Sequence, residues 1–146
     1  EIYNKAKDCN CKILIPEDFI IAKNTNDNLS NKIQNSVSKD EMILDIGPKT
    51  IEKINKTIDV SNIVLWNGPA GFFENKNFSK GTVSIAKKIS NNTVKNSLIS
   101  IVGGGDTLAA IKNNDLKLKF THLSTAGGAF LEYIEGKNLP GIEVLK

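Results

Sequence analysis

The sequence has 146 residues, of which 40% are hydrophobic and 24% charged, a composition that is typical of a globular domain and excludes a disordered chain. The 19 basic and 16 acidic residues leave a net charge of +3 with no run of five like charges, which argues against a nucleic-acid-binding surface. No apolar run approaches the ~20 residues of a membrane span, and no basic-then-apolar leader opens the sequence, so neither secretion nor membrane insertion is expected.

Two cysteines and one histidine are too few for a structural zinc site. Cys9 and Cys11 are therefore expected to be reduced thiols of a cytoplasmic protein. His122, which has no obvious acidic partner, is expected to be structural.

The first third of the chain is predicted to form a helix and three short strands. Apolar runs bounded by turn residues place the helix at 1–7 and the strands at Lys12–Ile15, Asp18–Ala22 and Met42–Ile46. The segment 24–40 is polar and rich in Asn and Ser, which indicates an exposed excursion that a β-hairpin would satisfy. Met42–Ile46 is predicted to return the chain to the sheet.

A helix is predicted after Gly47-Pro48, because proline suits the first turn of a helix. Ile51, Ile54 and Ile58 are three and four residues apart, which gives this helix one apolar face.

The rest of the chain repeats one design, in which a strand, a glycine-containing turn and a helix follow one another. The predicted strands are Ile63–Trp66, Leu98–Val102 and Lys117–His122, and the helices that follow them span about 79–89, 106–112 and 126–135. Ser124 and Thr125 are candidates to cap the last helix, and Gly136 ends it. Right-handed crossovers place all three turns at one edge of a parallel sheet, where open α/β folds bind their ligands.

The turn after Leu98–Val102 has the properties of a phosphate-binding turn. Gly103, Gly104 and Gly105 remove every Cβ from the approach to the main chain and to the start of the next helix. Asp106 places one carboxylate where it can hold a phosphate-bound magnesium ion, although it could instead cap the helix.

The start of the last helix also favours an anion. Glycine costs roughly 0.5–1 kcal/mol relative to alanine inside a helix, so Gly127 and Gly128 need a reason, and close approach of an anion to bare N–H groups supplies one. A Walker loop is absent, and Leu108 breaks the Gly-x-Gly-x-x-Gly pattern of the common dinucleotide sites.

Six segments, in order, resemble the C-terminal part of the phosphoglycerate kinase family. They are Leu44–Thr50, Leu65–Glu74, Gly81–Thr82, Gly103–Thr107, His122–Ala129 and Leu139–Ile142. The resemblance implies a three-layer, Rossmann-like α/β fold with helices on both faces of a parallel sheet. It identifies residues 1–146 as a partial C-terminal, nucleotide-binding domain of a two-domain kinase.

The resemblance also implies the reaction and the roles of individual residues. The reaction transfers a phosphoryl group from 1,3-bisphosphoglycerate to Mg-ADP, giving 3-phosphoglycerate and ATP in glycolysis, and the family is usually monomeric. Asp106 would hold magnesium, and Gly127 and Gly128 would face the group in flight. The nucleotide would be bound by Leu44, Asn67, Pro69, Phe72, Glu74, Gly104, Gly105, Asp106 and Thr107.

Several alternatives stay open at this point. Glu74 could be a solvated surface acid, and one of Phe72 and Phe73 is expected in the core, as is Trp66. Ala126 stands where many relatives carry glycine, and Ile43 stands where some do.

The family's N-terminal domain, with its triose-phosphate site, has no counterpart in this sequence, so we expect a fragment without activity of its own. The competing hypotheses are a stand-alone nucleotide- or anion-binding module and a purely structural α/β domain.

Overall fold

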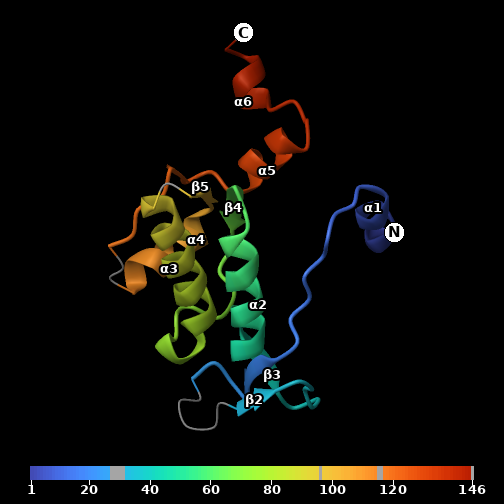
Figure 1. The fold of residues 1–146 in the computed structure, drawn as a ribbon, viewed down its shortest axis with the longest axis vertical. Coiled ribbons are helices and arrows are strands. Elements are labelled where there is room, and N and C mark those ends of the chain that lie inside the picture. Colours follow the sequence, from blue (N-terminus) through green and yellow to red (C-terminus); the bar gives the residue numbers. More distant parts are fainter. Residues whose placement is uncertain (27–31, 96, 115–116, 146) are drawn as a thin grey trace.

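The computed structural model describes residues 1–26, 32–95, 97–114 and 117–145, which form two three-stranded sheets and the helices around them (Figure 1). In chain order the elements are α1 (Ile2–Asp8), β1 (Phe19–Ala22), β2 (Lys32–Gln34), β3 (Met42–Ile46), α2 (Pro48–Asp59), β4 (Ile63–Asn67), the 3-10 turn η1 (Lys76–Phe78), α3 (Lys80–Val94), β5 (Ile99–Gly103), α4 (Gly105–Asn113), β6 (His122–Ser124), α5 (Gly128–Ile134) and α6 (Pro140–Glu143).

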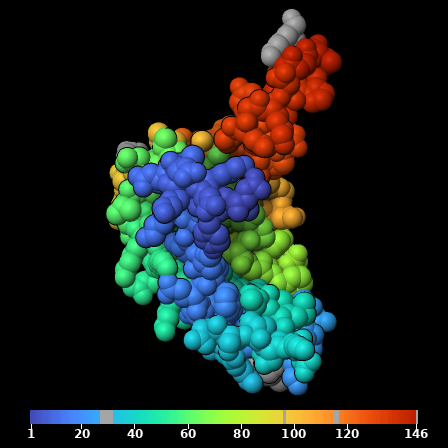
Figure 2. All heavy atoms as spheres, turned by 90° about the vertical axis from the view of Figure 1, so that its right-hand side faces the viewer, coloured from blue at the N-terminus to red at the C-terminus, as the bar shows by residue number. Residues whose placement is uncertain are grey.

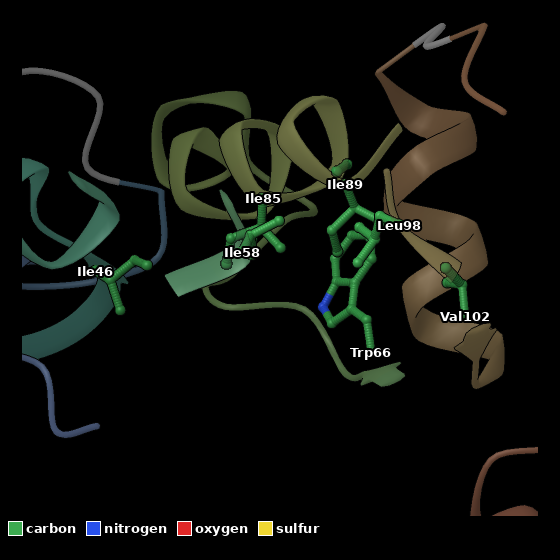
Figure 3. Close-up of a cluster of buried hydrophobic side chains, with 8 residues drawn as sticks. Ile46, Ile58, Trp66, Ile85, Ile89, Leu98 and Val102 are labelled. Carbon is green, nitrogen blue, oxygen red and sulfur yellow. The ribbon is translucent and has the colours of Figure 1, made fainter. Parts of the chain in front are cut away.

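The sheet β4-β5-β6 is parallel, as the apolar character of its strands predicts. Helices α3 and α4 contact β5, and α2 packs against α3, so the predicted α/β architecture is confirmed. Trp66 lies in the resulting core with the other members of a cluster: Ile46, Ile58, Ile85, Ala86, Ile89, Leu98 and Val102 (Figure 3). Trp66 is 8% exposed, which confirms that it belongs to the core.

The opposite face of this sheet is open at β4 and β5. Ile63, Leu65 and Ile99 are 62%, 40% and 50% exposed, respectively. Ile63 and Ile99 are directly paired across the two strands, so their side chains point to the same side. The helical layer predicted for this second face therefore does not cover these residues.

The second sheet is antiparallel, with the order β2-β1-β3. The segment 24–40 contributes one strand, β2, which pairs with β1 outside that segment, so the hairpin differs from the one expected within 24–40. The connection between β1 and β2 includes residues 27–31, which lie outside the described residues. Strand β3 returns the chain to a sheet as expected, but this is the antiparallel sheet, in which β3 pairs with β1. The apolar run of β3 is explained by burial of Leu44, Asp45 and Ile46 between this sheet and the helices.

Two predicted strands differ from the structure. Lys12–Ile15 is not a strand, and Ile13 and Ile15 are 38% and 50% exposed. The last strand occupies His122–Ser124 rather than Lys117–His122. Before it, side-chain hydroxyls replace main-chain ladder bonds: Thr121 N donates to Ser100 Oγ at 3.0 Å, and Lys119 N donates to Ser90 Oγ at 2.9 Å.

Helices α5 and α6 extend away from the rest of the molecule in two perpendicular views (Figures 1 and 2). Gly136 has a φ of 85° and follows the C-cap residue of α5, Glu135, as expected for the residue that ends this helix. The expected side-chain cap is absent, because Gly127 is the N-cap and Ser124 Oγ accepts from Ala126 N instead. No helix among the described residues has the length and apolar character needed to cross a membrane.

Candidate functional site

The three strand ends of the parallel sheet meet at one edge. Asn67 at the end of β4 pairs with Gly103 at the end of β5, and Gly103 pairs with Ser124 at the end of β6. The predicted convergence of the three turns is therefore confirmed by the register of the strands.

Glycines bring these turns into contact. Gly104 has a φ of 94°, and a Cβ on it would lie 2.5 Å from Asn67 Oδ1. A Cβ on Gly127 would lie 3.2 Å from Gly104 Cα, and Asn67 Nδ2 donates a long hydrogen bond of 3.5 Å to Gly127 O. Asn67, Gly104 and Gly127 are therefore in close contact at the sheet edge, with Gly104 buried between the other two turns.

Helix α4 begins at this contact. Its N-cap is Gly104, so the alternative in which Asp106 caps the helix is wrong. Asp106 lies in the first turn, is exposed, and has no hydrogen-bond or ion-pair partner among the residues that the structure describes. Gly105 is exposed as well, and a Cβ on it would meet nothing within 4 Å. The start of α4 thus offers free N–H groups, positive dipole and an uncommitted carboxylate.

Thr107 connects two of the turns. It is fully buried, and its Oγ1 accepts from Gly68 N at 2.7 Å, while Gly68 O accepts from Trp66 Nε1 at 2.8 Å. The structure thus gives Thr107 an internal role between β4 and α4, and its contact with a phosphate stays a prediction.

The residues expected at the nucleoside lie on the segment between β4 and α3 and on β3. Phe72 N donates to Leu44 O at 2.7 Å, which joins these two parts of the chain. Leu44 is buried with Ala22 and Phe78, and Phe72 packs against them, whereas Phe73 is buried, so the expectation of one core phenylalanine is confirmed. An open cleft of about 520 Å³ lies beside Phe72 and is lined by Asn26, Phe72, Glu74, Asn75, Lys76 and Asn77.

Glu74 is exposed at this cleft, and Pro69 is partly buried near the start of the segment. The structure places Phe72 and Glu74 at the same cleft. It places Asn67, Gly104 and Gly127 in contact with one another at the sheet edge. Gly128 is the first residue of α5, exposed and with open space around it. The roles of all these residues remain predictions.

A buried carboxylate, Asp45, is absent from the predicted site residues. It is 1% exposed and accepts hydrogen bonds from Gly81 N at 2.9 Å and Ile46 N at 2.8 Å. Burial raises the pKa of Asp45 to about 6 from its ordinary 3.8, against the opposing effect of its N–H donors and of Lys80. The signal in the sequence is a charged residue inside the apolar run Ile43–Ile46, because a buried charge requires partners.

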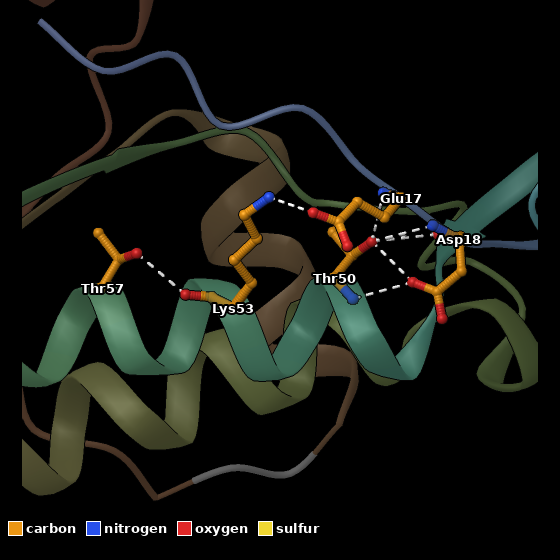
Figure 4. Close-up of polar contacts among 5 residues, drawn as sticks. All are labelled: Glu17, Asp18, Thr50, Lys53 and Thr57. Carbon is orange, nitrogen blue, oxygen red and sulfur yellow. Dashed lines mark hydrogen bonds and ion pairs between the residues drawn. The ribbon is translucent and has the colours of Figure 1, made fainter.

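A second buried carboxylate, Asp18, holds the start of α2 (Figure 4). It accepts from Lys49 N at 3.0 Å, from Thr50 N at 2.8 Å and from Thr50 Oγ1 at 2.7 Å. Although burial acts to raise it, these hydrogen bonds prevail and lower the pKa of Asp18. Lys53 and Glu17 form an ion pair beside it.

A metal site made of protein groups alone is not present in the described part of the chain, where no cluster of three or more His, Cys, Asp or Glu side chains could hold an ion. A single carboxylate such as Asp106 suits magnesium that arrives with phosphate oxygens, since this ion is usually held by one or two carboxylates together with substrate phosphates.

Comparison with known proteins agrees with this geometry. The family model "Phosphoglycerate kinase" matches residues 1–137. The phosphoglycerate kinase of Xanthobacter autotrophicus is 43% identical over 100% of this chain, and that of Rhodopseudomonas palustris is 45% identical over 99% of it.

Solved structures give the same result. The phosphoglycerate kinase from Coxiella burnetii superposes with a TM-score of 0.86 at 39% identity, covering 99% of this chain and 37% of that one. The enzyme from Pyrococcus horikoshii gives 0.73 at 31% identity, covering 89% of this chain and 31% of that one.

The chain spans 37% of the length of both curated relatives. Its sequence, its fold and the order of its motifs lead to one conclusion: the chain belongs to the phosphoglycerate kinase family.

Proposed function

We propose that this chain supplies the magnesium-nucleotide side of a phosphoglycerate kinase, within the C-terminal domain of a two-domain enzyme. The reaction would be reversible transfer of a phosphoryl group from 1,3-bisphosphoglycerate to Mg-ADP, giving 3-phosphoglycerate and ATP in glycolysis. The observation that carries the proposal is the contact of Asn67, Gly104 and Gly127 at the sheet edge, with the uncommitted carboxylate of Asp106 beside it.

The phosphate end of the nucleotide would lie at the start of α4. Gly105 is exposed and leaves the main chain open, so phosphate oxygens could accept from the free N–H groups of the first turn, next to Gly104, which is in contact with Asn67. Asp106 would hold the magnesium ion, which neutralises phosphate charge when it is bound. Gly127 and Gly128 would present N–H groups to the phosphoryl group, where negative charge must be stabilised during transfer.

The nucleoside end would lie at the cleft beside Phe72. Glu74, exposed at that cleft, would accept hydrogen bonds from the ribose hydroxyls, and Leu44, Pro69 and Phe72 would line the adenine and ribose pocket. This division suits phosphoryl transfer, which depends on positioning and charge neutralisation more than on a covalent nucleophile.

The phosphoglycerate substrate, 3-phosphoglycerate or 1,3-bisphosphoglycerate, would be bound by the part of the longer relatives that this chain does not match. We infer that the isolated chain binds Mg-ADP without turning over phosphoglycerate, and that the complete enzyme acts in the cytoplasm as a monomer. Measurable turnover of 3-phosphoglycerate and ATP by the purified chain would contradict this division of labour.

Calorimetry with Mg-ADP tests the nucleotide site. We expect Asp106→Ala and Glu74→Ala each to weaken binding at least fivefold, through loss of the magnesium ligand and of the ribose acceptor. Glu52→Ala is the matched control, because Glu52 is an exposed acid on α2 whose removal changes the net charge equally. Wild-type affinity in both site variants would refute the assignment.

A further inference from the structure

The buried carboxylate of Asp45 lies where three parts of the nucleotide side meet: β3, the start of α3, and the segment 68–79 between β4 and α3. We propose that Asp45 is a positioning residue for the nucleoside. It fixes the segment 68–79, which carries Phe72 and Glu74, against β3, which carries Leu44. This inference rests on the proposed function and assigns to it a residue that touches neither nucleotide nor metal.

Helix α3 begins without a cap from its own N-cap residue, since Ser79 forms no side-chain capping bond. Asp45, from strand β3, replaces that cap, because its Oδ2 accepts from Gly81 N at 2.9 Å, and the neighbouring Lys80 also favours its ionised form. A carboxylate at this point satisfies free N–H groups and interacts favourably with the positive end of the helix dipole.

The carboxylate of Asp45 has no free space around it. A Cβ on Gly71 would lie 2.6 Å from Asp45 Oδ1 and 2.5 Å from Phe78 O, and a Cβ on Gly81 would also collide with Asp45. Gly71 belongs to the segment and Gly81 to the helix, so the carboxylate is enclosed between them. The segment therefore cannot shift toward β3 without displacing Asp45.

The hydrogen bonds that the segment itself donates to β3 and α3 are neutral. Phe72 N donates to Leu44 O at 2.7 Å, and Ala70 N donates to Thr82 Oγ1 at 2.9 Å. Asp45 acts on the segment through packing against Gly71 and through charge-assisted hydrogen bonds to the start of α3, where the segment ends. Charge-assisted hydrogen bonds are roughly twice as strong as neutral ones, so this part of the hold on the segment depends on ionisation of Asp45.

Protonation of Asp45 has two opposite effects. A protonated carboxyl turns one oxygen into a donor, so the N–H group of Gly81 or Ile46 loses its acceptor. The start of α3 is then held less firmly against β3, and so is the segment that ends there. Protonation also relieves the burial of a charge, so the stability of the whole fold rises.

The charged groups on the surrounding elements are Lys80 on α3, Asp18 before β1, and Glu74 and Lys76 on the segment. Lys80 acts to keep Asp45 ionised, and Asp18 is itself committed to the start of α2. As the pH falls through about 6, nucleotide affinity should fall while stability attributable to Asp45 increases.

The test compares Asp45→Asn with Asp18→Asn, a matched control that removes a buried helix-capping carboxylate away from the segment. Hydrogen exchange is measured separately for peptides covering 68–82 and 48–60, and Mg-ADP affinity is measured by calorimetry from pH 5 to 8. We expect Asp45→Asn to accelerate exchange in 68–82 and to weaken Mg-ADP binding at least fivefold at pH 7.5. The affinity ratio of wild type to Asp45→Asn should shrink below pH 6, since phosphate titration is common to both proteins. Asp18→Asn should accelerate exchange in 48–60 and leave Mg-ADP affinity within twofold of wild type.

Wild-type affinity in Asp45→Asn, or unchanged exchange in 68–82, would overturn the proposal. Failure of the wild type to bind Mg-ADP would instead refute the proposed function, and the exchange comparison would still decide whether Asp45 holds the segment. If Asp45→Asn does not fold, adenosine binding to the wild type decides, because adenosine has no phosphate to titrate. Weaker adenosine binding below pH 6 supports the proposal, and an adenosine affinity that stays constant from pH 5 to 8 overturns it.

Discussion

Substitution of Gly104 by alanine should damage both the fold and the site. Gly104 has a φ of 94° and a ψ of 134°, a conformation that costs a residue with a Cβ on the order of 1–3 kcal/mol. The new Cβ would lie 2.5 Å from Asn67 Oδ1, so the Asn67 side chain must move and its bond to Gly127 O is lost, adding about 0.5–1.5 kcal/mol. Together these effects lower the free energy of unfolding by roughly 1.5–4.5 kcal/mol.

The neighbouring residue provides the control. Gly105 lies in the first turn of α4, and a Cβ on it would have nothing within 4 Å, so Gly105→Ala should keep or slightly raise stability, by up to about 1 kcal/mol. Its methyl group would nevertheless occupy the approach to the helix start and weaken Mg-ADP binding. Urea unfolding and calorimetry on both variants separate these effects. A Gly104→Ala protein within about 0.5 kcal/mol of wild type would refute the reasoning.

Three further predictions concern the fold around the site. Ser100→Ala should lower the free energy of unfolding by about 1–3 kcal/mol, because Thr121 N and Thr93 Oγ1 lose their acceptor; urea unfolding measures this, and a neutral result would show that the hydroxyl does not replace a ladder bond. The raised pKa of Asp45 contributes stability that is present below about pH 4 and lost as the pH rises through about 6. Between pH 4.5 and 7, the free energy of unfolding of wild type should therefore fall by on the order of 2 kcal/mol relative to that of Asp45→Asn. The same pH dependence of stability in both proteins would contradict the raised pKa of Asp45. Phe78→Ala, at a fully buried ring, should destabilise by about 3–5 kcal/mol in thermal melts, whereas Val60→Ala at an 84% exposed position should change little.

The local patterns predicted the parallel part of the fold well, because a parallel strand buried by crossover helices is a continuous apolar run. The bounds of β5, Ile99–Gly103, differ by one residue at each end from those of the predicted strand, Leu98–Val102. The meeting of Asn67, Gly103 and Ser124 followed from the handedness of the crossovers, and the register confirms it.

The errors arose where the partner of a strand is decided by tertiary structure. Met42–Ile46 is equally apolar in either sheet, so its pairing with β1 cannot be read from its own residues. Lys117–Thr121 alternates like a strand because Leu118 and Phe120 pack against the core, while hydroxyls of distant serines take its main-chain bonds. The structural roles of Asp45 and Asp18 could not be predicted for the same reason, since the helix ends that they satisfy are 36 and 32 residues away in sequence, respectively.

These two carboxylates also determine whether the molecule unfolds in one step or two. The antiparallel and parallel sheets share no strand, and a molecule of this kind could melt in two steps. Asp18 and Asp45, however, belong to the antiparallel part and satisfy the first turns of α2 and α3, which cover the parallel part. If either part unfolded alone, buried N–H groups or a buried carboxylate in the remaining part would lose their hydrogen-bond partners. The two sheets therefore form one cooperative unit and unfold in a single transition.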